Sequence, residues 1–227
     1  TIMIQAFRMA AEPFFFNKSK DENAQQTYAR VMKFFVIACC FMFLFIGLFL
    51  DAFRWIFITF ANPRWVEGME VVPLLALGNI FLGIYYNLSV WYKLTNKNLY
   101  GAAITIGGAA ITIALNILLI PKLHYTDAAL ATFCCYLFMM ISSYLLGQKH
   151  YPVPYAVKKM IAYLTLVVLI YFVHMGLLKW INDSISFSLG TGFVLFLFFT
   201  WFVSRVEAKE LANLPVIGKY FKPPAAS

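Results

Sequence analysis

Arg8 and Glu12 are two opposite charges, four residues apart, in the otherwise apolar opening segment Thr1–Phe16. Residues four apart share one face of an α-helix, so both side chains would point the same way. If this helix reaches a membrane surface near Phe16, Arg8 lies about 12 Å deep, at ~1.5 Å of rise per residue. An ionised group at that depth has to face protein or a water-filled cavity, and such residues mark substrate or ion paths. A structural ion pair between the two, or an arginine that extends to the interface, is the alternative interpretation.

Three further residues, Asn79, Gly83 and Asn87, follow one another at four-residue spacing in a later apolar segment and share one helix face. Asn79 and Asn87 are therefore candidate substrate-binding amides. Amides inside helical bundles more often hydrogen-bond neighbouring helices, which is the competing interpretation. A single His174 in the fifth span is interpreted as an interfacial polar residue rather than a proton relay.

No set of residues predicts catalysis, a cofactor or a metal site. The four cysteines form two adjacent pairs, Cys39–Cys40 and Cys134–Cys135, with no C-x-x-C or Cys/His spacing. The sequence contains no glycine-rich phosphate loop and no nucleophile elbow, and the loops 121–126 and 179–184 are too short to build a site. These features favour a transporter over an enzyme.

The elements that would position these residues are six apolar stretches of 18 to 22 residues. That length crosses a hydrocarbon core of ~30 Å as a helix, and helices satisfy the backbone groups that lipid cannot. The sequence predicts an all-α polytopic membrane protein with spans at Lys33–Leu50, Val71–Trp91, Leu99–Ile120, Asp127–Gly147, Met160–Leu178 and Ile185–Val203.

Charge gives the predicted orientation. Hydrophobic residues make up 62% of the 227-residue chain and charged residues only 12%, which excludes an ordinary soluble domain. Fourteen of the 18 Lys and Arg residues fall in the N-terminal segment, the loops after the second and fourth spans, and the tail; the others are Arg54, Arg64, Lys122 and Lys179. Basic loops stay in the cytoplasm, so both ends of the chain are predicted to be cytoplasmic, and the net charge of +8 needs no nucleic acid to explain it.

Local signals give further expectations. Thr1–Phe16 is slightly short for a span and is expected to end near Pro13, so the chain is predicted to be a fragment whose first helix begins upstream. Ala103 and Gly107, four apart in the third span, predict a close helix contact. This span is expected to stop at Pro121, and Asp127 to cap the next. The tail, Val206–Phe221, suits an interfacial helix.

One stretch carries a family resemblance. Asn116-Ile-Leu-Leu-Ile-Pro121 followed by Asp127-Ala-Ala-Leu-Ala-Thr132 resembles the end of the eleventh span and the start of the twelfth in polysaccharide flippases of the multidrug/oligosaccharidyl-lipid/polysaccharide exporter superfamily. The opening Ala6-Phe-Arg8 to Glu12-Pro13-Phe-Phe-Phe looks like the end of the eighth span in Bacteroidetes-type members. His124 and Asp127 depart from the pattern, because the family often has glycines there.

The resemblance implies the second lobe of a two-lobed, 14-helix exporter. On it, 1–16 is the end of a transmembrane helix, 17–148 a four-span bundle, 149–204 two additional spans and 205–227 a cytoplasmic tail. The implied function is translocation of a polyprenyl-diphosphate-linked oligosaccharide across a bacterial inner membrane by alternating access, for surface polysaccharide biosynthesis. Arg8 would attract the diphosphate, and Glu12 would tune that charge or accept a coupling cation. The implied partners are the lipid-linked substrate, membrane lipid and the N-terminal lobe.

Three other functions compete with the flippase, one of them a purely structural membrane subunit, for which the charge at Arg8 would be dispensable. A cation-coupled multidrug exporter belongs to the same class of protein. A membrane enzyme acting on polyprenol-linked sugars belongs to another, and it would need a large extracytoplasmic loop with catalytic residues.

Overall fold

A computed structural model describes the chain except for residues 1, 61–62, 124, 182–183 and 212–227. The described residues form helices and connecting turns and contain no strand. The elements are α1 Ile2–Lys18, α2 Ala24–Leu48, α3 Leu50–Phe60, the 3-10 helix η1 Pro63–Val71, α4 Val72–Leu88, α5 Val90–Leu94, α6 Asn98–Leu123, α7 Tyr125–His150, α8 Val157–Trp180, α9 Ile185–Val206 and α10 Ala208–Leu211.

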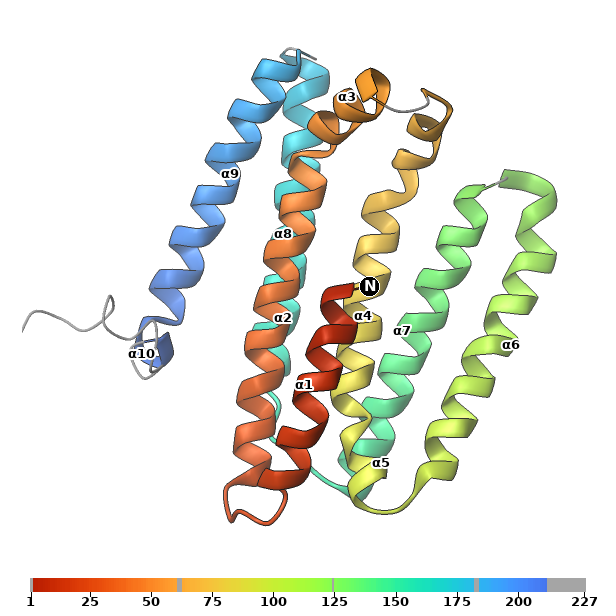
Figure 1. Cartoon of the computed structure of the whole chain (residues 1–227), viewed down its shortest axis with the longest axis vertical. Coiled ribbons are helices and arrows are strands. Elements are labelled where there is room, and N and C mark those ends of the chain that lie inside the picture. Colours follow the sequence, from red (N-terminus) through yellow and green to blue (C-terminus); the bar gives the residue numbers. More distant parts are fainter. Residues whose placement is uncertain (1, 61–62, 124, 182–183, 212–227) are drawn as a thin grey trace, which may run out of the picture.

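Six helices are long and apolar enough to cross a membrane within the described part of the chain. They run side by side, and the direction alternates from each to the next (Figure 1). One end of the bundle, which we call the basic end, holds the α1–α2 turn, α5, the α7–α8 link and α10. At the opposite end lie α3, η1, the ends of α6 and α8 and the starts of α7 and α9 (Figure 1). The prediction of a polytopic helical membrane protein is confirmed.

The span limits differ from the prediction mainly where polar residues continue a helix. The first span starts at Ala24, not Lys33, and α1 runs through Pro13 to Lys18 instead of ending near the proline. Pro13 is exposed, and membrane helices tolerate proline because other groups can satisfy the freed carbonyl. Similarly, α6 continues past Pro121 to Leu123.

The expected cap and tail also change. Because α7 begins at Tyr125, Asp127 lies within its first turn rather than before it. At the C-terminus, α10 covers Ala208–Leu211, and the rest of the predicted interfacial helix lies outside the described residues.

The main apolar core lies around α2, which packs against α8 and α4. Its fully buried side chains include Val36, Cys40 and Leu44 from α2, Val167 from α8 and Phe199 from α9. A second set of close contacts joins α7 to both α4 and α6. Of the two helices joined by the α7–α8 link, α7 therefore packs against α4 and α8 packs against α2.

The predicted small-residue contact on α6 is shifted round the helix. Ala103 is exposed, whereas Gly101 and Gly108 are buried. A methyl group at Gly108 would lie 2.9 Å from Met139 Cγ on α7, and one at Gly101 would lie 2.7 Å from the Tyr92 ring. Gly107 is at the edge of this contact, where a methyl group would meet Phe138 at 3.0 Å. Gly101 and Gly108, seven residues apart, rather than Ala103 and Gly107, permit the close approach of α6 to α5 and α7.

Candidate functional site

Helix α1 places Arg8 and Glu12 beside the bundle. Its residues Ile4, Ala11 and Phe15 are buried and form one face, which packs against α2, α4 and α5. Arg8 and Glu12 flank this face, and both are half-buried. The two predicted site residues are therefore brought to the same region, between α1 and the α4–α5 segment.

Arg8 lies over an aromatic ring. Its guanidinium carbon lies 4.9 Å from the centre of the Tyr86 ring on α4, within the range of a cation–π interaction. Among the described residues, no carboxylate lies within ion-pair distance of Arg8. The positive charge at this position is thus held by a π face and is not neutralised by an acid of the described chain.

Glu12 is paired with another residue. Its carboxylate forms an ion pair and hydrogen bond with the ammonium of Lys93 on α5, both partners being partly exposed. The structure therefore does not support the alternative interpretation of an Arg8–Glu12 ion pair. Lys93 is a member of this site that the sequence reasoning missed, because 81 positions separate it from Glu12. Its place on a basic loop was the only signal available.

The side-chain N–H groups of Asn79 and Asn87, the polar strip on α4, donate hydrogen bonds within their own helix. Asn79 Nδ2 donates to the Leu75 carbonyl at 2.8 Å, and Asn87 Nδ2 donates to the Gly83 carbonyl at 3.1 Å. Gly83 faces Phe35, so this side of α4 packs against α2. Asn79 also lines a small cavity of about 110 Å³ with residues of α1 and α2. The strip lies in a packed interface, and its amides do not reach Arg8 through any hydrogen bond of the described residues.

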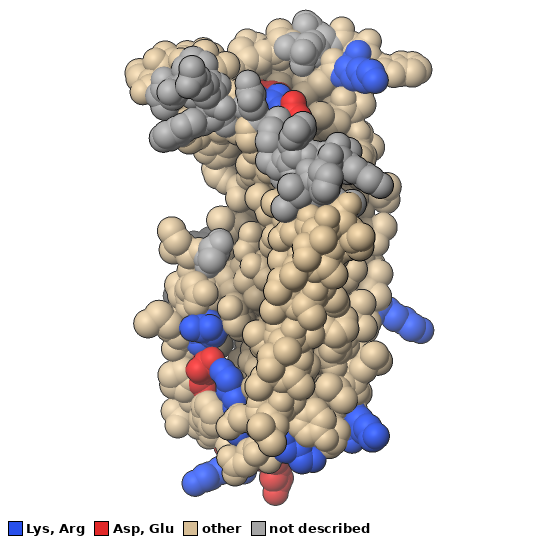
Figure 2. Space-filling model, turned by 90° about the vertical axis from the view of Figure 1, so that its right-hand side faces the viewer, with Lys and Arg blue, Asp and Glu red and all other residues tan. Residues whose placement is uncertain are grey.

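Charged side chains gather toward the ends of the bundle. The described part of the face seen in Figure 2 has few charged residues in its middle, with most Lys and Arg in its lower part and a further charged group near the upper end. The Arg8, Glu12 and Lys93 group carries two positive charges and one negative charge. A site of this kind attracts an anion more readily than a cation.

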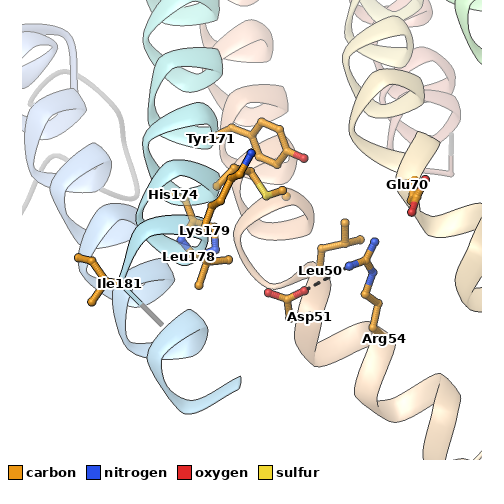
Figure 3. Close-up of a pocket in the computed structure, with 11 residues that line it drawn as sticks. Leu50, Asp51, Arg54, Glu70, Tyr171, His174, Leu178, Lys179 and Ile181 are labelled. Atoms are coloured by element: carbon orange, nitrogen blue, oxygen red, sulfur yellow. Dashed lines mark ion pairs between the residues drawn. The ribbon is translucent and has the colours of Figure 1, made fainter. Parts of the chain in front are cut away.

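The opposite end of the bundle contains a cavity of about 680 Å³ with titratable groups in its lining (Figure 3). Asp51 and Arg54 come from α3, His174 and Lys179 from α8, and Glu70 from η1. Asp51 Oδ2 accepts a hydrogen bond from Ser188 Oγ at 2.7 Å. Sequence reasoning placed no site here, although the i, i+3 pair Asp51 and Arg54 directly after an apolar span was a usable signal.

A buried ionic network occupies the basic end. Glu207, at the end of α9, accepts hydrogen bonds from Lys33 Nζ at 2.7 Å, Tyr163 Oη at 2.7 Å and Lys159 Nζ at 3.2 Å. Lys33 also pairs with Glu210. Burial alone would raise the pKa of the Glu207 carboxyl, but the hydrogen bonds from Lys33, Tyr163 and Lys159 outweigh it and hold this pKa below its usual value. This network ties α2, α8 and the α9–α10 segment together.

The described residues offer no grouping of three or more His, Cys, Asp or Glu side chains that could hold a metal ion. The four cysteines are free thiols, and three of them, Cys39, Cys40 and Cys135, are buried. They act as apolar packing residues.

Comparison with known proteins adds no assignment: no family model, no curated protein and no solved structure matches the chain.

Proposed function

We propose that this chain is the C-terminal half of a bacterial inner-membrane flippase that moves a polyprenyl-diphosphate-linked oligosaccharide across the bilayer by alternating access. The bundle of six helices able to span a membrane supports a multi-pass transporter. The 14-helix architecture, the cytoplasmic location of both ends and a role in surface polysaccharide biosynthesis belong to the same proposal. They rest on the charge distribution and on the resemblance.

The observation that carries the proposal is the state of Arg8. Its guanidinium makes a cation–π contact with Tyr86 and has no carboxylate partner among the described residues. The contact holds the guanidinium beside the ring, and its planar set of N–H donors can bind two oxygens at once. A diphosphate presents such oxygens, so Arg8 is suited to bind the charged part of a lipid-linked sugar.

The pairing of Glu12 with Lys93 strengthens the preference for an anion. A free carboxylate at position 12 would favour a cationic drug or a coupling cation, but Lys93 already neutralises it. The local balance of charge stays positive, and this favours the lipid diphosphate over the alternative multidrug exporter. Asn79 and Asn87 have a subordinate place in the proposal, because their N–H groups are bound within α4.

The test is an export assay in cells that depend on this protein, with its level in the membrane measured in parallel. We expect Arg8→Ala to abolish export and Arg8→Lys to restore part of it, because lysine keeps the charge and loses the planar fork. Arg205 is a matched control, since it is exposed in the last turn of α9 and its guanidinium carbon lies 5.9 Å from the Trp201 ring centre. Arg205→Ala should leave export intact. Full export by Arg8→Ala at a normal protein level would overturn the proposal.

A further inference from the structure

The cavity at the end opposite the basic end has charged side chains of both signs in its lining, Asp51 and Glu70 against Arg54 and Lys179. Its wall combines α2 and α3 on one side with the last turns of α8 on the other, and Glu70 of η1 also faces it (Figure 3). At about 680 Å³ it falls within the size range of ligand-binding sites in proteins. This cavity is separate from the proposed diphosphate site, because the Arg8 site lies between α1 and the α4–α5 segment.

Two cations of the cavity have hydrogen-bonding capacity left over. Arg54 Nε is buried and has no partner among the described residues, and its closest carboxylate contact is a long one, 3.7 Å from Nη1 to Asp51 Oδ1. Lys179, in the last turn of α8, forms no ion pair with any described residue. The two side chains come from different helices, Arg54 from α3 and Lys179 from α8, and both line this cavity (Figure 3). A buried donor without a partner is costly, and an anionic oxygen would satisfy it.

The remaining lining suits hydroxyl groups. Ser188 holds one oxygen of Asp51 in place at 2.7 Å, and Glu70 presents an exposed carboxylate at the other side of the cavity. Carboxylates accept hydrogen bonds, whereas Tyr171 offers both an apolar ring and a hydroxyl. A ligand with an anionic group and several hydroxyls would match both signs of charge in the lining, and an anionic oxygen would accept from Arg54 Nε more strongly than a neutral one.

We propose that this cavity binds an acidic sugar, a saccharide unit that carries a carboxylate or phosphate group. Arg54 and Lys179 bind the anionic group, and Asp51 and Glu70 accept hydrogen bonds from the hydroxyls. The choice of a sugar rests on the proposed function, in which the glycan has to pass the end of the bundle opposite the Arg8 site. The binding site itself depends only on the groups that line the cavity.

The experiment is a calorimetric titration of the purified protein in detergent with trigalacturonate, an acidic trisaccharide, and with maltotriose, a neutral one of matched size. We expect trigalacturonate to bind at least about tenfold more tightly than maltotriose, and Arg54→Gln or Lys179→Gln to weaken its binding about tenfold each, as loss of a charge-assisted hydrogen bond would. Arg54→Lys should retain part of the affinity. Arg205→Gln, which removes an exposed charge in the last turn of α9, should leave the affinity for trigalacturonate unchanged. Unfolding temperatures identify any variant that fails to fold.

Several results would overturn the inference: no binding of trigalacturonate, equal affinity for maltotriose, or unchanged affinity in both Arg54 variants. Inorganic phosphate that binds as tightly as trigalacturonate would show a site for a small anion, and the sugar would be rejected. The proposed function fails separately. A protein that binds trigalacturonate through Arg54, yet exports normally as Arg8→Ala, keeps this site and loses the diphosphate flippase.

Discussion

The ammonium of Lys33 and the carboxylate of Glu207 lie 2.7 Å apart, although 174 positions separate them along the chain. Both side chains are almost completely buried. Ion pairs removed from water gain little over an apolar pair, but loss of one member leaves an unpaired charge and is strongly destabilising. The contact therefore fixes how the end of α9 docks on α2.

A double-mutant cycle should show this coupling. We expect Lys33→Met and Glu207→Gln each to lower the free energy of unfolding by about 1.5–3 kcal/mol, the range for hydrogen bonds to charged groups, because each remaining residue keeps another partner. The double variant should lose less than the sum of the two, with a coupling energy of roughly 0.5–3 kcal/mol. Thermal unfolding in detergent measures it. Lys18→Gln, which breaks the exposed pair with Asp21, is the control and should cost at most about 1 kcal/mol. Strict additivity would contradict the prediction.

The same network predicts how stability depends on pH. Because partners in the folded state hold the pKa of Glu207 below its ordinary value of 4.5, the carboxylate contributes stability above that pH. This contribution disappears as the pH falls through the folded-state pKa. The unfolding temperatures of the wild type and of Glu207→Gln should therefore differ most near neutral pH and converge in acid. A difference that grows on acidification would reverse the sign of the argument.

The glycine at position 83 is expected to tolerate no side chain. A methyl group there would lie 2.5 Å from Cζ of Phe35, whose ring is buried and packs 4.3 Å from Phe7, centre to centre. Since the ring has little room to move, Gly83→Ala should destabilise the protein by roughly 1–3 kcal/mol, as overpacking does. At Gly176 on α8, a methyl group would meet no atom within 4 Å. Gly176→Ala should be neutral or should stabilise by up to about 1 kcal/mol, because alanine is the better helix former.

Much of the fold could be predicted because a membrane span is recognisable from the length and hydrophobicity of its own residues. The six apolar stretches and the alternation of basic loops follow from length, composition and charge, and the helices run as that pattern requires. The limits were wrong where tertiary contacts override composition. Composition predicts that a span starts at Lys33, but ion pairs with Glu207 and Glu210 allow this lysine to be buried inside α2.

The sites were harder to predict, because they depend on which helix ends meet. Spacing put Arg8 and Glu12 on one side of α1, but it gave no indication that Glu12 would choose Lys93 or that Tyr86 would lie under Arg8. The cavity at Arg54 was unpredictable for the same reason. Its charged residues come from α3, η1 and α8, which are far apart in the sequence, and no local pattern indicates that they meet.

Orientation in the membrane remains a prediction of the charge distribution. Lys149, in the last turn of α7, and Lys179, in the last turn of α8, are both exposed and lie at opposite ends of the bundle. In a background whose four cysteines are replaced by alanine, Lys149→Cys should react only with a membrane-permeant thiol reagent in intact cells. Lys179→Cys should also react with an impermeant one. The opposite pattern would invert the topology.

The pair formed by Glu12 and Lys93 separates a structural role from a transport role at the candidate site. Both partners are partly exposed, so the pair itself should contribute modestly, up to about 1 kcal/mol. We expect Glu12→Lys to lower both stability and export, since it places a third positive charge beside Arg8 and leaves Lys93 without its partner. The exchange variant, Glu12→Lys with Lys93→Glu, should restore the unfolding temperature because the pair can form again in reverse. It should also restore export if only the net charge around Arg8 matters.

Arg8→Ala should behave differently, with export lost while the unfolding temperature changes little, because Arg8 contacts a ring and no described carboxylate. Measuring export and unfolding on the same preparations makes the comparison decisive. An exchange variant that remains as unstable as Glu12→Lys would show that Glu12 and Lys93 do not interact in the membrane.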